Sequence, residues 1–337
     1  MPINQAWLDQ IIEDVIEPEL PICDPHHHFW DRLGSRYLLE ELLADAGGGH
    51  RLRSTVFIEC MSMFNHRASV TMAPVGETEF VQGIAAQSAS GQYGETVVAA
   101  GIVGFADLLL GNDVEPVLAA HVAASPNRFR GIRHACSWDA SDEIRNSHTK
   151  PPPQLYLNDQ FREGFACLQT HNLLFDAWLY HTQLAELASL ARAFPRQRII
   201  LDHVGGPLGK GPYANHREEV RQIWEQGIAD LASCPNVVIK LGGLAMDING
   251  FRWNKRKLPP TSEELAGATA PYINYCIQQF GPERCMFESN FPVDKVSCSY
   301  TILWNSFKRI AKDYSAADKA HLFHDTAVEV YRLGEPL

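Results

Sequence analysis

The chain has 337 residues, a formal net charge of −11 at pH 7, 45% hydrophobic residues and 20% charged residues. This composition is typical of a globular protein. The acidic charge argues against a nucleic-acid or anionic-membrane partner, since either would need clustered Lys and Arg, and no apolar run is long enough to cross a membrane. We therefore expect a small-molecule ligand. Whether the chain forms a homo-oligomer stays open.

The N-terminal segment and the cysteines bear on where the protein resides. The stretch MPINQAWLDQIIEDVIE is acidic and periodic, whereas a secretory signal is basic and then apolar. We expect residues 1–20 to form a short helical cap on the fold. The eight cysteines are scattered and form no C-x-x-C pair, which favours buried free thiols over disulfides or a zinc knuckle. Both features predict a cytoplasmic protein.

Eight short apolar runs predict strands along the whole chain. In chain order they are PICDPHHHF, STVFIEC, ETVVAAGIVGFADLL, FRGIRHACSW, NLLFDAWLY, QRIILDHVG, NVVIKLGG and RCMFESNFP. Most intervals hold an amphipathic stretch of helical period, namely FREGFACLQTH, QLAELASLARAF, REEVRQIWEQGIADLASC and AGATAPYINYCIQQF. After the second run, FNHRASVTMAPVGETEF reads as a loop before a helix begins. The alternation predicts one (β/α)₈ barrel domain over residues 1–337.

An open, doubly wound sheet is the alternative, but no G-x-G-x-x-G or P-loop motif follows any run. In a parallel barrel the carboxyl ends of the strands form the active face. Polar residues concentrate there, at His26 to His28, Glu59, Arg133, His134, Trp178 to His181, Asp202, His203, Lys240 and Glu288 to Asn290. For each residue, capping a strand or pairing with a neighbour is the alternative to a role in a site.

Three consecutive histidines follow Asp-Pro in the first predicted strand. Successive strand residues point to opposite faces, so Asp24, His26 and His28 are expected to share one face and His27 the other. Neutral imidazole is a common zinc ligand, so His26 and His28 can converge on one ion. A hydrogen-bonded pair of core histidines is the alternative.

Four stretches, DPHHHFWD, LDHVGGP, VVIKLGGL and MFESNFPVD, resemble motifs of the amidohydrolase superfamily. The resemblance spans nearly the whole chain and is closest to the lactonase-like branch, which includes fuconolactonase, sulfomuconolactone hydrolase and pyrone dicarboxylate lactonase. It implies a distorted (β/α)₈ barrel that hydrolyses a lactone or related carbonyl compound, with one zinc ion or with none. His26 and His28 match the family's His-x-His, and His203 matches its histidine after the sixth strand.

The chain departs from the family pattern after the eighth predicted strand. There the family has an aspartate that serves as general base, and this chain has Asn290. A neutral amide cannot take a proton near pH 7. Glu288 lies on the same predicted face, about 6.6 Å deeper, and is our first choice as base; Glu59 is a further candidate metal ligand. For both carboxylates, a buried pair with Lys240, Arg133 or a histidine is the alternative.

Aromatic residues crowd the expected rim and favour a flat or ring-containing ligand. They are Phe29, Trp30, Trp138, Tyr156, Trp178, Tyr180, Phe251, Trp253 and Phe291. We predict substrate contacts from Trp30, Arg133, Trp178, Tyr180, His181 and Lys240, with the Arg133 fork on a carboxylate or carbonyl. The basic stretch DINGFRWNKRKLPP is either a solvated loop or a lid that recruits an anionic substrate.

These observations predict a hydrolase that adds water to a small cyclic ester. His26, His28 and His203 would polarise the carbonyl or hold water, with zinc, with another divalent metal or without metal, and Glu288 would receive the proton. Two alternatives stay open. One is a metal-dependent decarboxylase of an aromatic or unsaturated acid. The other is a non-catalytic ligand-binding barrel, because Asn290 replaces the usual aspartate.

Overall fold

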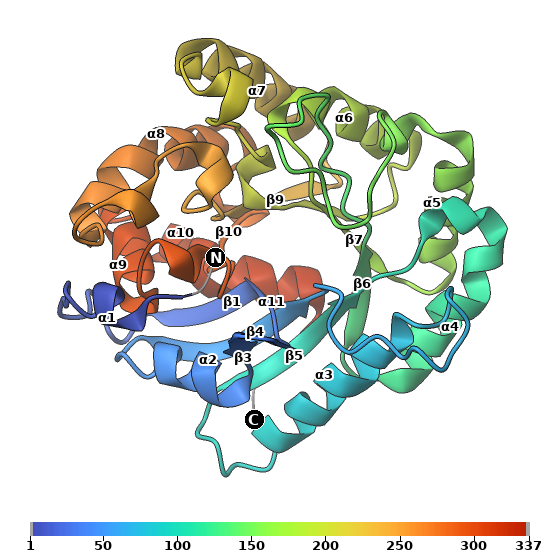
Figure 1. Cartoon of the computed structure of the whole chain (residues 1–337), viewed down its shortest axis with the longest axis horizontal. Helices are drawn as coiled ribbons and strands as arrows, with labels where there is room; N and C mark the ends of the chain where they lie inside the picture. Colours follow the sequence, from blue (N-terminus) through green and yellow to red (C-terminus); the bar gives the residue numbers. More distant parts are fainter. Residues whose placement is uncertain (1–2, 335–337) are drawn as a thin grey trace.

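The computed structural model describes residues 3–334 and contains a ring of eight parallel strands surrounded by helices (Figure 1). The strands pair in the order β1-β4-β5-β6-β7-β8-β9-β10. Their bounds are β1 (Pro21–His27), β4 (Arg51–Ile58), β5 (Val97–Gly104), β6 (Phe129–Arg133), β7 (Leu174–Ala177), β8 (Ile199–Leu201), β9 (Val237–Leu241) and β10 (Cys285–Phe287). All eight predicted strands are confirmed, and the open-sheet alternative is wrong.

The ring closes just beyond the end of β10. His28 N donates to Phe291 O at 2.8 Å, and Asn290 N donates to His26 O at 2.9 Å. A single parallel bridge between His27 and Phe291 accompanies these bonds. The residues that carry the candidate site therefore also form the seam of the barrel.

The helices lie outside the ring, and a small hairpin follows β1. The helices are α1 (Gln5–Leu8), α2 (Leu39–Ala46), α3 (Val75–Ser88), α4 (Glu115–Ala124), α5 (Asp159–Thr170), α6 (Leu184–Ala193), α7 (Arg217–Ala232), α8 (Ser262–Phe280), α9 (Tyr300–Ile310), α10 (Ala316–Ala320) and α11 (Thr326–Tyr331). The hairpin pairs β2 (Trp30–Arg32) with β3 (Ser35–Tyr37). The four quoted amphipathic stretches fall on α5 to α8, and α3 begins inside the stretch expected to be a loop followed by a helix. Within residues 3–334, no helix combines the length and apolar character that crossing a membrane requires.

The N-terminal segment lies against α8 and α9. Its only regular element among the described residues is the four-residue α1. Glu13 accepts a hydrogen bond from Ser262 N at 2.8 Å, and Ile16 N donates to the Asn305 side chain at 2.9 Å. Residues 1 and 2 of the predicted cap lie outside the described residues. Side-chain contacts hold this segment in place, and helix forms only a small part of it.

The interior of the barrel is apolar at one level of the strands. Inward residues from seven strands pack with Ala327 and Tyr331 of α11, namely Cys23, Val56, Ile58, Val103, Leu174, Ile200, Val238 and Met286. Helix α11 crosses the centre of the ring in Figure 1. We call this group the floor. All eight cysteines are free, as predicted, and all but Cys60 are buried.

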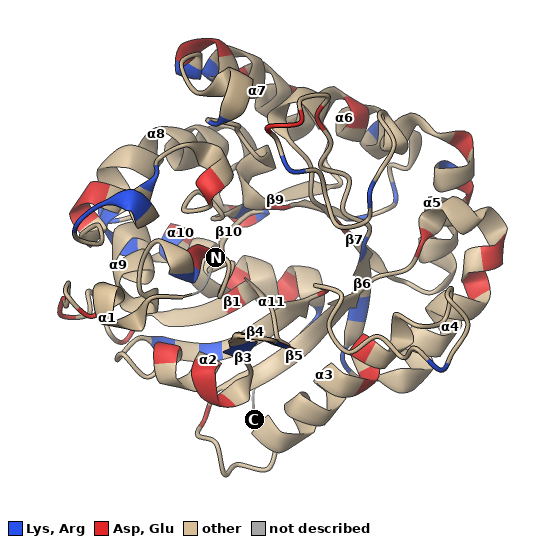
Figure 2. Cartoon of the chain, viewed as in Figure 1, with Lys and Arg blue, Asp and Glu red and all other residues tan. Residues whose placement is uncertain are grey.

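Charged residues are spread over the outer helices and loops (Figure 2). A surface position costs an ion little, because water solvates it, whereas a buried ion needs a partner. The charged side chains inside the ring therefore need an explanation of their own, and they mark the level above the floor.

Helix α5 packs closely on the 3₁₀ segment Leu108–Val114, and Gly164 makes the approach feasible. A Cβ at Gly164 would overlap the Leu108 carbonyl oxygen, whereas a Cβ at Gly267 of α8 would meet nothing within 4 Å. We expect Gly164→Ala to destabilise the protein by about 1–3 kcal/mol, because the two segments must separate. Gly267→Ala is the control and should stabilise by up to about 1 kcal/mol. Urea unfolding measures both, and equal effects would contradict the packing described.

Candidate active site

The candidate site begins where the barrel interior changes from apolar to charged. On four strands, the residue two positions after a floor residue is ionisable and fully buried: Asp176 follows Leu174, Asp202 follows Ile200, Lys240 follows Val238, and Glu288 follows Met286. Residues two apart on a strand face the same side, so these four form a charged layer directly above the floor. Arg133 and His26 join it from β6 and β1.

Glu288 connects two of the predicted histidines. Its Oε1 lies 2.7 Å from His203 Nδ1 and accepts the His203 backbone N–H at 3.1 Å. Its Oε2 lies 2.8 Å from His26 Nδ1, although no N–H is aligned with that oxygen. Burial alone would raise the pKa of Glu288, but His203 and His26 outweigh it and hold that pKa well below its usual range. Glu288 is therefore a carboxylate that orients both imidazoles.

His28 offers one unprotonated ring nitrogen. Its Nδ1 lies 2.8 Å from Ile58 O, and because a carbonyl only accepts, Nδ1 carries the hydrogen and Nε2 keeps its lone pair. Burial, then His26 and Arg133, lower the pKa of His28 well below its ordinary value. The His28 ring lies 4.9 Å from that of His26 between centroids. These two histidines share a face, as predicted.

His27 lies on the other face of β1. Its Nε2 contacts Thr55 Oγ1 at 2.8 Å, and its ring packs edge-on against Phe29. Burial first, with His26 beside it, lowers the pKa of His27 to about 3. His27 is thus a neutral core side chain.

Asp24 does not share the face of the histidines, which corrects the prediction. Asp24 pairs with Thr55, and His27 pairs with Phe57. A step of three residues along β1 therefore matches a step of only two residues along β4. Such a bulge breaks strict alternation. Asp24 instead accepts hydrogen bonds from Ser289 N and Tyr300 Oη, both at 3.0 Å.

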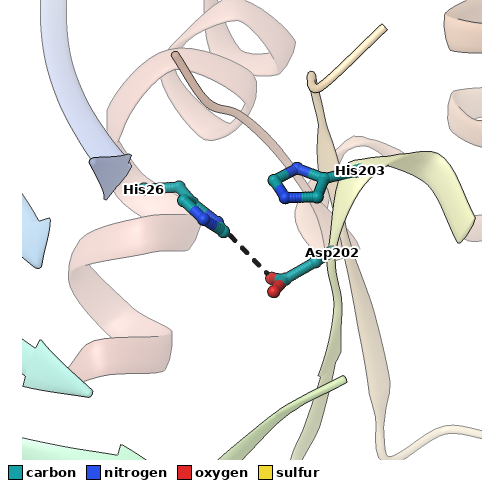
Figure 3. A group of neighbouring side chains, drawn as sticks. All are labelled: His26, Asp202 and His203. Carbon is teal, nitrogen blue, oxygen red and sulfur yellow. Dashed lines mark ion pairs between the residues drawn. The ribbon is translucent and has the colours of Figure 1, made fainter. Parts of the chain in front are cut away.

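His26, Asp202 and His203 form a group with metal-binding potential (Figure 3). One ligand atom from each lies within 4.8 Å of the others. In Figure 3 the side chains face one another, with His26 Nδ1 3.6 Å from Asp202 Oδ1. Two imidazoles and one carboxylate are ordinary zinc ligands, so these residues fit a divalent ion. The predicted set was His26, His28, His203 and Glu59; among the described residues, His28 and Glu59 stand outside this group, and Asp202 was missed.

Lys240, which we predicted as a substrate contact, lies fully buried at the base of the charged layer. Its ammonium lies 2.6 Å from Asp176 Oδ2, 3.0 Å from Asp202 Oδ1 and 3.1 Å from His26 Nδ1. Burial would lower the pKa of Lys240, but the carboxylates Asp176 and Asp202 raise it above its ordinary value. Lys240 is therefore a permanent internal cation.

Arg133 and Glu59 are paired with each other, which leaves neither free for its predicted partner. Arg133 donates through Nε to Glu59 Oε1 at 2.8 Å and through Nη2 to Glu59 O at 2.6 Å. Its third nitrogen lies 3.3 Å from His26 Nε2 and 3.4 Å from Asp202 Oδ2. His148 Nε2 takes the other Glu59 oxygen at 3.0 Å. Although burial opposes it, His148 and then Arg133 bring the pKa of Glu59 to about 2.

The charged layer carries an excess of negative charge. Within the described part of the chain, four buried carboxylates, those of Glu59, Asp176, Asp202 and Glu288, face two permanent cations, Arg133 and Lys240. Burial raises the pKa of Asp176 to about 6, although Lys240 opposes this. A protonated imidazole or a divalent cation would balance the remaining charge.

Two of the predicted rim residues flank the histidines. Trp178 packs edge-on against the His203 ring, with centroids 4.7 Å apart, and Trp30 stacks on His28 at 6.2 Å. Tyr180 and His181 do not face the site. Tyr180 Oη donates to Arg145 O, and His181 Nδ1 accepts from Leu208 N at 3.4 Å, so both fix loops. Other predicted rim aromatics lie fully buried in the core, namely Phe29, Tyr156 and Phe291.

The basic loop is exposed, which fits both a solvated loop and a lid. The side chains of Arg252, Lys255, Arg256 and Lys257 are exposed, and Arg256 pairs with Glu264 at 2.6 Å.

Asn290 is engaged at the barrel seam and not with the imidazoles. Its backbone has φ 54°, a left-handed conformation that Asn tolerates well. Its Nδ2 donates to Asp294 Oδ1 at 3.1 Å. Asp294 is fully buried, and burial raises its pKa well above the ordinary value. The amide at position 290 thus supplies a donor that the family's aspartate lacks.

Comparisons with known proteins agree on a family. Residues 23–333 match the protein family described as Amidohydrolase. Protein y4mH of Sinorhizobium fredii is 32% identical over 94% of this chain and 99% of its own length. An L-fucono-1,5-lactonase of Burkholderia multivorans is 28% identical over 70% of this chain and 73% of its own.

Solved structures share the fold. An amidohydrolase of Burkholderia multivorans with bound HEPES has a TM-score of 0.69 at 24% identity and covers 93% of this chain and 99% of that one. The same enzyme was also solved with bound zinc. The 5-carboxyvanillate decarboxylase of Novosphingobium aromaticivorans has a TM-score of 0.54 at 14% identity, over 94% and 97% of the two chains.

The Asn290 contact generates a prediction for Asn290→Asp. The variant loses the donor to Asp294 and brings two buried carboxyl groups together, so the pair retains a proton more tightly when folded than when unfolded. The Asn290→Asp variant therefore keeps its free energy of unfolding below about pH 4 and loses part of it as the pH rises. We expect a deficit of about 1–3 kcal/mol at neutral pH. Urea unfolding across the pH range measures this. Asn290→Gly keeps the left-handed backbone and adds no second carboxyl group, so its stability deficit relative to the wild type should depend less on pH; an Asn290→Asp deficit that does not grow with pH would refute the contact.

Proposed function

The chain belongs to the amidohydrolase family, and on that premise we propose that it hydrolyses a small cyclic ester by adding water at the carboxyl end of the barrel. It is a hydrolase of the lactonase-like branch. The observation that carries the reaction is Glu288, a buried carboxylate held against His203 and His26 with one oxygen lacking an aligned donor. That oxygen can accept a hydrogen bond from the attacking water, and because the pKa of Glu288 is low, a proton received there is passed on readily.

Each of these residues has a separate role in the proposed reaction. Glu288 Oε2 receives the proton from water as the water oxygen bonds to the carbonyl carbon, and this proton passes to the ring oxygen when the ring C–O bond breaks. His28 Nε2, the free lone pair beside His26, positions water by accepting a hydrogen bond. Arg133 and Lys240 hold His26 and Asp202 in place. These fixed charges need no rearrangement during the reaction.

A divalent ion would be held by His26, Asp202 and His203 and would supply polarisation of the ester carbonyl. We propose zinc, since this donor set suits it and the related Burkholderia amidohydrolase binds zinc. The excess negative charge of the layer supports a cation there.

The charge of the layer also supports an uncharged substrate. Among residues 3–334, both permanent cations of the layer are already bound to carboxylates, so neither is left to pair with a substrate carboxylate. The flat faces of Trp30 and Trp178 suit a ring. We therefore propose an uncharged lactone, in line with the L-fucono-1,5-lactonase relatives. The same argument disfavours the decarboxylase alternative, whose substrate is an acid anion.

Other expectations accompany this proposal. We propose that the protein acts in the cytoplasm on a small molecule, without nucleic acid or membrane as partner, and that a homo-oligomer is compatible with this role. The free cysteines support a reducing compartment.

Glu288→Gln tests the proposed role of the carboxylate. The amide keeps the size of the side chain but cannot accept a proton, so kcat on a panel of uncharged lactones should fall by about 10²–10⁴. Glu77→Gln is the control, since Glu77 is equally buried but accepts the Cys60 and Ser62 N–H groups through one oxygen that Gln retains. An active Glu288→Gln enzyme, measured by base consumption, would show that Glu288 is structural.

Metal content tests the donor set separately from activity. Protein purified without chelator should contain up to one equivalent of zinc, and His26→Gln should weaken zinc binding by roughly tenfold or more. His27→Gln is the matched control, because His27 faces Thr55 on the other side of the strand. Elemental analysis and chelator competition measure both. Loss of zinc from both variants alike, or zinc binding unchanged in His26→Gln, would rule out this donor set.

A further inference from the structure

Helix α11 reaches the charged layer from the floor through one side chain. Tyr331 is fully buried and packs with the floor residues. Its hydroxyl passes beyond that apolar level and donates to Asp176 Oδ2 at 2.6 Å. A hydroxyl is costly to bury without a partner, so this bond explains why the ring faces the layer.

From Asp176, further contacts lead through Lys240 to His26. The Asp176 oxygen that accepts from Tyr331 also accepts from Lys240 Nζ at 2.6 Å. The same ammonium lies 3.1 Å from His26 Nδ1, the nitrogen that faces Glu288. All four side chains of this path, Tyr331, Asp176, Lys240 and His26, are fully buried. Since no solvent screens them, a change at one end alters the position and field at the other.

The lysine needs such an anchor. Its ammonium is a point charge on a flexible four-carbon stem, so its position relative to His26 depends on the oxygens that hold it. With the Tyr331 donor removed, Asp176 Oδ2 has only Lys240 as donor and attracts the ammonium more strongly. The ammonium is then drawn toward Asp176 and away from His26.

We propose that Tyr331 is a positioning residue of the site, which sets the place of His26 through Asp176 and Lys240. No substrate reaches Tyr331. The effect on turnover rests on the proposed function, whereas the effect on the His26 ring does not.

The chain contains a matched control for this path. Tyr37 donates to Asp45 Oδ2 at 2.8 Å, and Lys295 donates to Asp45 Oδ1 at 2.6 Å. In both sets the ammonium lies over the tyrosine ring, at 5.6 Å for Lys295 and 5.5 Å for Lys240. Tyr37 is buried like Tyr331. The two sets thus share their chemistry, and only one leads to the histidines.

The experiment compares Tyr331→Phe with Tyr37→Phe in the full chain. Histidine ring nitrogens are observed by NMR in protein labelled with ¹⁵N-histidine, and His26→Gln assigns the His26 signals. Tyr331→Phe should shift the His26 ring signals, and Tyr37→Phe should leave them in place. Where the wild type opens a lactone, Tyr331→Phe should lower kcat about 10- to 100-fold with KM unchanged, because an outer partner of the reacting groups is lost.

Two results would overturn the proposal. One is an unchanged His26 signal in Tyr331→Phe, and the other is an equal shift in Tyr37→Phe. If Tyr331→Phe does not fold, Asp176→Asn replaces it and Asp45→Asn replaces the control. An unchanged His26 signal in Asp176→Asn, or an equal shift in Asp45→Asn, would then overturn the proposal. If the wild type opens no lactone, the proposed function fails, yet the NMR comparison still accepts or rejects the role of Tyr331.

Discussion

Pairing of buried charge is the constraint on which the site depends. The interior above the floor excludes water, and an unpaired ion there would cost several kcal/mol. Each charged group therefore has fixed partners, such as Arg133 with Glu59 and Lys240 with Asp176. This pairing holds His26 and His203 in place, and it leaves neither Arg133 nor Lys240 without a carboxylate partner.

The barrel and its active face could be predicted from the sequence. Every strand carries an apolar run with a polar end, and in a parallel barrel these ends meet on one face. Strand parity also placed His26 and His28 together and His27 apart, as the ring contacts show. His203 followed from the motif LDHVGGP, and Glu288 from its parity on the last strand.

The alternation of residues along the strands did not reveal how deep in the barrel each side chain lies or with which residue it pairs. Lys240 and Arg133 face inward as expected, but they lie where carboxylates surround them. Asp176 and Asp202 could have been found by asking which inward acids balance those two cations. The bulge that turns Asp24 away has no local sequence signal. Tyr331 lies 155 residues from its partner Asp176, and only the closed barrel brings the two together.

The most direct measurement compares two lactones that differ only in a carboxylate. One ring is uncharged, the other carries an additional acid group, and both are incubated with the protein in ¹⁸O-water. Because Arg133 and Lys240 are both already paired with carboxylates, the account predicts preferential opening of the uncharged ring, with one ¹⁸O atom in the product by mass spectrometry. Preference for the acid, or release of CO₂ without ¹⁸O incorporation, would contradict the account.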